Sequence, residues 1–201
     1  QTPVIDKDFN VYTGSDMGWV ISYTKDGAIR WYRQVGPKRA QSPAILGGML
    51  YVGTGDGYVS ALNLSTGDVV WRTPVSTACG EDAYSVTAVD GRIILPVGKV
   101  LPFGSPEVVA LNATTGRYVW RYSVAGKLGR SDIQGTTVNL AAPVVGDAVF
   151  LNDVTGGIHK LSATDGRELW FQAGENPESY TLGGVSVGPD NVLYSGFSID
   201  G

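Results

Sequence analysis

The chain has 201 residues, a net charge of −4, 43% hydrophobic residues and 17% charged residues. This length allows one large domain or two small ones with a substantial core, and the composition excludes a disordered chain. Nucleic-acid binding is not expected, because such affinity comes mainly from clustered Lys and Arg and the sequence has no basic stripe. No run of about 18 apolar residues is present that could span a membrane as a helix.

The 28 glycines are scattered through the sequence instead of forming a low-complexity tract. Scattered glycines indicate many short strands separated by turns, so the composition favours an all-β protein. Cys79 is the single cysteine, which excludes an internal disulfide framework and a cysteine-based metal site. We interpret it as a buried or half-buried thiol.

A short segment ending in Trp occurs four times along the chain. The copies read ISYTKDGAIRW from Ile21, SALNLSTGDVVW from Ser60, VALNATTGRYVW from Val109 and HKLSATDGRELW from His159. Their Trp residues, at positions 31, 71, 120 and 170, are 40, 49 and 50 residues apart. These intervals are close to the length of one four-stranded blade of a β-propeller.

Two further alternating segments precede each copy, as in AIL-GG-MLYVGTGDGYV before the second. Each unit therefore predicts four antiparallel strands joined by tight turns. We predict an all-β chain, one β-propeller segment over 1–201, with four complete blades and the first two strands of a fifth. The approximate blade limits are 1–35, 42–74, 84–123, 141–172 and 183–201. Because the fifth unit is incomplete, we expect the chain to be part of a larger propeller.

Within each copy the residue types predict a hairpin between the third and fourth strands. The Leu of each long copy lies on the third strand, the following Asn or Ser starts the turn with its side-chain oxygen, and Gly closes it with a positive φ. The turn glycines are Gly67, Gly116 and Gly166. We predict that Trp31, Trp71, Trp120 and Trp170 pack between neighbouring blades. The alternative role for each Trp is a platform on which a ligand stacks.

The pattern Leu-Asn-x-x-Thr-Gly followed by Val-Trp resembles the repeat of pyrroloquinoline-quinone (PQQ)-type β-propellers. This family includes periplasmic quinone-dependent dehydrogenases and non-enzymatic scaffolds, so the resemblance implies a fold more firmly than an activity. Such a dehydrogenase would need carboxylates and amides around Ca²⁺, an Asp base and often an adjacent cysteine pair. The single cysteine excludes that pair. PQQ and Ca²⁺ are therefore expected only if the chain is a fragment of a PQQ-dependent alcohol dehydrogenase whose cofactor site lies mostly elsewhere.

The connections that lead from one predicted blade to the next are the long ones, at 34–41, 73–84, 123–141 and 172–181. Binding residues concentrate on long loops of a rigid scaffold, although most loop charges are simply solvated. The candidate loop-face binding residues are Glu81, Asp82, Lys127, Arg130 and Asp132. A carbohydrate-binding propeller would need exposed aromatic residues there, for which Tyr84 and Tyr180 are the candidates.

Two copies carry N-glycosylation acceptor sequences, Asn63-Leu64-Ser65 and Asn112-Ala113-Thr114. Both Asn residues start a predicted exposed turn, so they are candidate glycan sites in a secreted eukaryotic protein, with plain turn formation as the alternative. His159 is the single histidine, and we interpret it as a packing or surface residue.

The expected function is a non-catalytic scaffold or binding segment of a secreted, extracellular or periplasmic protein. Its expected partner is another protein or the remaining blades of the propeller.

Overall fold

The computed structural model describes residues 2–76, 85–97, 107–124, 142–153, 156–174 and 184–195. These residues form four four-stranded sheets and one two-stranded sheet, and they contain no helix. Every strand pairs antiparallel to its neighbour, and each sheet follows the order of the chain, from its first strand at one edge to its fourth at the other. The predicted all-β propeller with an incomplete fifth blade is confirmed.

The sheets have the following strands. The first comprises β1 (Val4–Ile5), β2 (Val11–Gly14), β3 (Trp19–Tyr23) and β4 (Ile29–Gln34). The second comprises β5 (Ala44–Leu46), β6 (Met49–Thr54), β7 (Tyr58–Asn63) and β8 (Val69–Pro74). The third comprises β9 (Thr87–Val89), β10 (Arg92–Val97), β11 (Glu107–Asn112) and β12 (Tyr118–Ser123). The fourth comprises β13 (Val144–Val145), β14 (Ala148–Asn152), β15 (Ile158–Ser162) and β16 (Glu168–Gln172), and β17 (Val185–Val187) pairs with β18 (Leu193–Ser195).

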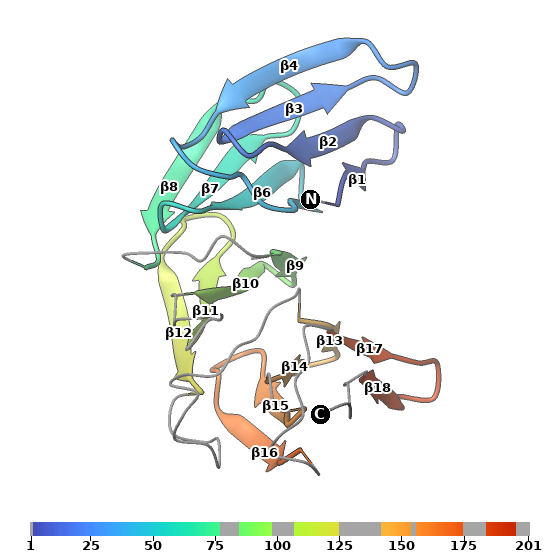
Figure 1. Ribbon diagram of the computed structural model, residues 1–201, viewed down its shortest axis with the longest axis vertical. Coiled ribbons are helices and arrows are strands. Elements are labelled where there is room, and N and C mark those ends of the chain that lie inside the picture. Colours follow the sequence, from blue (N-terminus) through green and yellow to red (C-terminus); the bar gives the residue numbers. More distant parts are fainter. Residues whose placement is uncertain are drawn as a thin grey trace, which may run out of the picture.

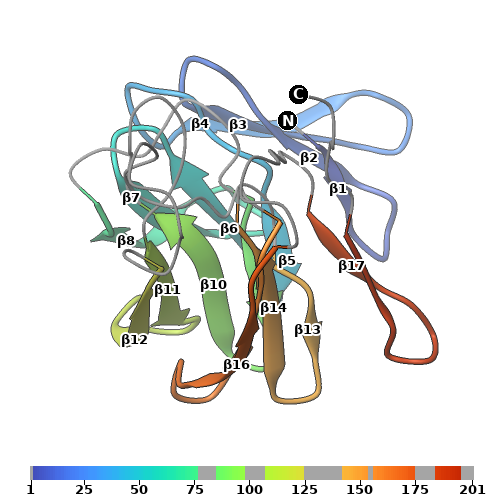
Figure 2. The ribbon, with the colours of Figure 1, turned by 60° about the horizontal axis from the view of Figure 1, so that its bottom comes forward.

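The sheets are arranged along an arc (Figure 1). The first strands β1, β9 and β13 lie toward the inside of the arc, and the fourth strands β4, β8, β12 and β16 lie on its outer side. The turned view in Figure 2 shows the β17 hairpin beside the fourth sheet, where Val185 packs against Ala148 and Phe150.

The hydrophobic core is divided among the junctions between consecutive sheets. One buried cluster joins the first and second sheets around Tyr12 and Leu50, and another joins the second and third around Tyr51 and Ile93. A third cluster joins the third and fourth sheets around Trp120 and Leu161. Stability therefore depends on how well each blade packs on the next.

The hairpins between third and fourth strands form as the sequence predicts. The Asn63 side-chain oxygen accepts the backbone N–H groups of Ser65 and Thr66 at 2.9 and 3.1 Å. Gly67 then has a φ of 74°, and Gly116 and Gly166 have φ values of 69° and 72°. The predicted left-handed glycines are confirmed, and they allow a tight turn that other residues would strain.

Each of these hairpins also contains an extra residue directly before its Trp. In the second sheet Ala61 pairs with Trp71 and Leu62 with Val69, so Val70 is bulged out of the ladder. The same register shift leaves Arg30, Val119 and Leu169 bulged in the other sheets. These four residues therefore occupy equivalent positions, which allows the junctions to be compared residue by residue.

Among the residues described, no helix is long and apolar enough to cross a membrane.

Candidate functional site

The Trp residues connect consecutive sheets by a hydrogen bond that recurs along the chain. Trp31 Nε1 donates to the carbonyl oxygen of Leu64 at 3.1 Å, on the second sheet. Trp71 donates in the same way to Ala113 at 2.9 Å, on the third sheet. Trp120 donates to Ala163 at 2.8 Å, on the fourth. Each indole is thereby held against the hairpin turn of the following blade.

The turn glycines lie directly against these indoles. A Cβ atom added to Gly67 would be 2.6 Å from the Trp31 ring, and one added to Gly116 would be 2.7 Å from Trp71. A side chain at either position would therefore collide with the ring. Glycine is required there both by its positive φ and by close contact with the neighbouring blade.

At the junctions described above, a Trp of one sheet packs on the glycine turn of the next. At the two ends of the described arc, one of these two parts is present without the other. Trp170, on the fourth sheet, is 39% exposed, whereas the docked Trp120 is 7% exposed. Gly27 is the turn glycine of the first sheet, and a Cβ atom added to it would meet nothing within 4 Å. Within the part of the chain that the structure describes, one end thus presents an indole and the other presents an uncovered turn.

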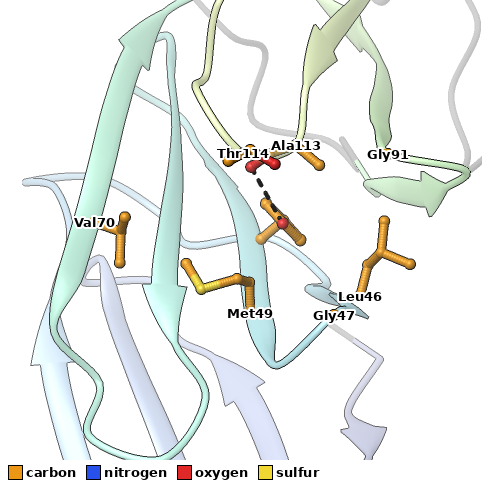
Figure 3. Close-up of a pocket in the computed structure, with 8 residues that line it drawn as sticks. Leu46, Gly47, Met49, Val70, Gly91, Ala113 and Thr114 are labelled. Carbon is orange, nitrogen blue, oxygen red and sulfur yellow. Dashed lines mark hydrogen bonds between the residues drawn. The ribbon is translucent and has the colours of Figure 1, made fainter.

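A cavity of about 370 Å³ opens between the second and third sheets, beside the docked Trp71 (Figure 3). Tyr51 forms part of its wall and donates its hydroxyl to the Ala113 carbonyl oxygen at 3.2 Å. Val70, at the mouth of the cavity, is 57% exposed. The lining residues are Leu46, Gly47, Met49, Tyr51, Val70, Gly91, Ala113 and Thr114.

The equivalent space between the first and second sheets is filled by a polar network. Arg30 Nη1 is 2.7 Å from the Tyr12 hydroxyl and 2.9 Å from Ser22 Oγ. The Tyr12 hydroxyl donates to Asp6 Oδ2 at 2.8 Å, and the Asn10 side-chain amide donates to the same oxygen at 2.9 Å. The long Arg30 side chain is thus held inside this junction by its hydrogen bonds to Tyr12 and Ser22.

Strand pairing identifies the corresponding residues of the second sheet. Tyr51 pairs with Ala61 as Tyr12 pairs with Ser22, which makes the two tyrosines equivalent. The other polar residues of the first network have apolar counterparts in the second sheet. In the hairpin turn of the following sheet, Leu is replaced by Ala. Val70 replaces Arg30, Leu46 replaces Asp6, Met49 replaces Asn10, Ala61 replaces Ser22, and Ala113 replaces Leu64. We call the contact between the first and second sheets the first junction, and the contacts that follow it the second and third junctions. The second junction therefore keeps the tyrosine and the docked Trp but lacks the polar side chains that fill the first junction.

Burial raises the pKa of the tyrosine at both junctions, Tyr12 and Tyr51, whereas the pKa of Asp6 at the first junction is lowered. Burial alone would raise the pKa of Asp6, but hydrogen bonds from Asn10, Tyr12 and Asp8 lower it to about 2. Burial raises the pKa of Tyr51, which lies among apolar side chains and remains a neutral hydroxyl over the physiological range.

His159 belongs to a buried chain of polar groups that joins the third and fourth sheets. Its Nε2 is 3.2 Å from Asp153 Oδ2, its Nδ1 is 3.1 Å from the Tyr122 hydroxyl, and its ring stacks on Phe171 with centroids 4.5 Å apart. The Tyr122 hydroxyl also donates to Glu168, and burial is the main cause that raises the pKa of Tyr122. His159 is fully buried, so it is a packing residue and not a surface residue.

The predicted site residues fall in three places. Asn63 and Asn112 each end a third strand, and they are half-buried where full exposure was expected, because their side-chain oxygens fold back onto the turn. Trp31, Trp71 and Trp120 contact the next sheet as described above. The loop-face candidates Glu81, Asp82, Lys127, Arg130 and Asp132 lie outside the described residues, as do Cys79, Tyr84 and Tyr180.

Neither the cavity nor the Asp153–His159 pair follows from the repeat pattern of the sequence. Within the described ranges, no three His, Cys, Asp or Glu side chains come together in a group that could hold a metal ion.

Four-stranded sheets arranged along an arc and docked by a repeated Trp define the chain as a segment of a β-propeller. The family model described as outer membrane protein assembly factor BamB matches residues 2–173 and 84–199. The chain belongs to this family of PQQ repeats. No curated protein sequence matches it significantly.

Solved structures show the same fold at low sequence identity. BamB from Moraxella catarrhalis has a TM-score of 0.69 and 17% identity, covering 94% of this chain and 58% of its own. Quinohemoprotein alcohol dehydrogenase ADHIIG from Pseudomonas putida HK5 has a TM-score of 0.72 and 18% identity, covering 96% of this chain and 37% of its own. The corresponding enzyme from Comamonas testosteroni has a TM-score of 0.72 and 16% identity, with coverages of 92% and 37%. The chain thus spans less than two thirds of these proteins.

Proposed function

We propose that the chain is a non-catalytic β-propeller scaffold of the cell envelope, periplasmic or extracellular, that binds a protein partner. The family match supports this proposal, because the name of that family describes an assembly factor of the outer membrane. The fold alone would suit an enzyme equally well, so the proposal depends on the surface of this particular chain.

The observation that carries the proposal is an apolar rim along the fourth strands. These strands lie at the outer edge of each sheet, where one side of the backbone has no partner strand in the described sheets. Large apolar side chains are exposed there on all four sheets. They include Ile29, Tyr32, Val69, Val70, Tyr118, Val119 and Leu169, with exposures between 41% and 63%. Exposed apolar groups beside a free strand edge are typical of protein interaction sites.

Photo-crosslinking in cells tests this function. A benzophenone amino acid is placed at Tyr32 or Leu169 on the rim, and at the exposed turn residue Lys25 as a matched control. We expect both rim positions to give the same protein adduct, identified by mass spectrometry, and the control to give none. Absence of a rim adduct, or an identical adduct at Lys25, would contradict the proposal.

A fragment of a PQQ-dependent alcohol dehydrogenase is the second candidate function. The TM-scores of 0.72 to two quinohemoprotein alcohol dehydrogenases favour it. Calcium-dependent PQQ binding and dye-linked alcohol oxidation by the full-length protein are the tests. If the protein gave a positive result in both assays, the dehydrogenase function would be supported and the scaffold function would be excluded.

We further propose that additional blades cover the two exposed halves of the junction, Gly27 and Trp170. Glycans on Asn63 and Asn112 are a separate prediction for a protein made in a eukaryotic secretory pathway. Intact-protein mass spectrometry of natively produced material tests the glycans, and an unmodified mass would exclude them.

A further inference from the structure

We propose that the cavity between the second and third sheets binds an uncharged aromatic molecule of about two fused rings that carries one hydrogen-bonding group. This site is separate from the outer rim proposed for a protein partner, although Val70 at its mouth belongs to both. The proposal is based on the chemistry of the lining, the size of the space and the comparison with neighbouring junctions.

The lining favours an uncharged ligand. Leu46, Met49, Val70 and Ala113 contribute apolar side chains, and none of the described residues that line the cavity carries a charge. Figure 3 shows these residues converging from the second sheet and from the turns of the third. A carboxylate or ammonium group would lose its hydration here without gaining a partner of opposite charge.

The volume favours a ligand larger than one ring. An enclosed apolar cavity of about 150 Å³ holds benzene. The space between the two sheets is about 370 Å³, so a single ring would leave more than half of it unfilled. A molecule with two fused rings would bury more apolar surface and contact more of the lining.

Tyr51 provides a directional contact inside the cavity. Its side chain is almost fully buried, and its hydrogen atom is committed to the Ala113 carbonyl oxygen at 3.2 Å. The hydroxyl oxygen can still accept a hydrogen bond. A ligand hydroxyl or N–H group that reaches this oxygen would be oriented by it, while the rest of the ligand contacts apolar atoms.

The neighbouring junctions show that the fold does not require this space. At the first junction, Arg30 fills the corresponding volume and bonds to the equivalent tyrosine, Tyr12. At the third junction Arg92 occupies the position of Met49, and its Nη2 reaches Thr164 Oγ1 across the gap at 3.4 Å. Among these three junctions, only the second has apolar side chains, Val70 and Met49, at both of the positions where its neighbours have an arginine. An occupant from outside the chain would take the place of these arginines.

Titration with 2-naphthol tests the proposal, with naphthalene-2-carboxylate as a charged ligand of the same ring size. Binding is followed by ¹H–¹⁵N NMR on the full-length protein. We expect saturable shifts of the Gly47, Gly91 and Thr114 amides with 2-naphthol, and affinity for the carboxylate weaker by about tenfold or more. Shifts elsewhere only, or equal affinity for the two ligands, would overturn the proposal.

The variant Ala113→Leu narrows the cavity with a side chain that Leu64 already provides at the first junction. We expect it to weaken 2-naphthol binding by about tenfold or more, because the added atoms occupy ligand volume. Val119→Leu, at an exposed bulge of the third sheet, is the matched control and should bind as the native protein does. Unchanged binding by folded Ala113→Leu would contradict the site.

Tyr51→Phe provides an independent readout that leaves the shape of the cavity intact. It should weaken 2-naphthol binding by about tenfold but leave naphthalene binding unchanged, because only the former uses the hydroxyl oxygen. An equal loss for both ligands, or no loss for either, would exclude the proposed contact.

Discussion

The first and second junctions of the propeller use the same docking contacts around very different interiors. Both have a docked Trp, a turn glycine beneath the indole and a tyrosine hydroxyl that lies 3.2–3.3 Å from the carbonyl oxygen to which that Trp donates. Tyr51 donates its hydrogen to that carbonyl oxygen, whereas Tyr12 donates its hydrogen to Asp6. The first junction then fills its remaining space with Arg30, Asp6 and Asn10, whereas the second leaves an apolar cavity.

This difference shows which residues of the repeat maintain the fold and which are free to vary. The Trp and Gly form contacts that any pair of adjacent blades needs, so they recur along the chain. The positions of Arg30 and Val70 lie beside these contacts and are not required by them. Changes at such positions can alter the surface or interior of one junction without altering the fold.

Removing the shared Trp should have the largest effect on stability and should affect both junctions equally. Trp31→Ala and Trp71→Ala each lose a large packed ring and a hydrogen bond, so each should lower the free energy of unfolding by about 3–5 kcal/mol. Urea denaturation followed by circular dichroism measures this effect. Tyr32→Ala is the control at a 63% exposed aromatic ring outside the docking position and should lose about 1 kcal/mol. A small effect at one junction only would show that the two do not share their docking contacts.

The polar filling of the first junction should contribute the next largest effect. Arg30→Met keeps most of the aliphatic side chain but removes the bonds to Tyr12 and Ser22, so it should destabilise the protein by about 1.5–3 kcal/mol. The exposed Arg117→Met is the control and should change stability by less than about 0.5 kcal/mol. If thermal denaturation showed equal losses of stability for Arg30→Met and Arg117→Met, the buried network would not contribute to the stability of the fold.

The cavity makes a further contrast between two equivalent alanines. Ala163→Leu adds atoms at the third junction, where Ala163 belongs to the buried cluster around Trp120 and Leu161, and should cost about 1–3 kcal/mol. Ala113→Leu adds the same atoms at the second junction, where the cavity can receive them, and should change stability by less than about 1 kcal/mol. If chemical denaturation gave the same loss of unfolding free energy for both variants, the second junction would have no space for the added Leu atoms.

The smallest effect concerns the pH dependence of the first junction. The pKa of Asp6 is lowered from 3.8 to about 2 in the folded protein. Its carboxylate therefore stabilises the fold fully above pH 3.8 and loses this contribution as the pH falls toward 2. In Asp6→Asn, calorimetric melting temperatures should fall less steeply over this range than in the native protein. The second junction has Leu46 at this position, so Leu46→Asn should leave the native pH dependence unchanged.

The fold was predictable because its signals are local. The Asn-to-Gly turns and the Trp that follows them lie within segments of about twelve residues, and the recurrence of these segments every 40 to 50 residues is that of propeller blades. The cavity could not be predicted in this way. It depends on Met49, Val70 and Ala113 meeting across two sheets. The repeat aligns Val70 with Arg30, but it does not show which side chains of neighbouring sheets face each other.

The role of His159 was only partly predictable for the same reason. Its partner Asp153 is near in sequence, but Tyr122 comes from the preceding sheet. A lone histidine on an alternating strand therefore left both packing and surface roles open, and only the position of Tyr122 distinguishes them.

A crystal structure of the protein grown with 2-naphthol tests the difference between the two junctions most directly. We expect the fused rings to lie between Met49 and Ala113, with the ligand hydroxyl within hydrogen-bonding distance of the Tyr51 oxygen and the first junction still filled by Arg30. A second junction closed by contact of Met49 and Val70 with Ala113, with no ligand between them, would contradict this account.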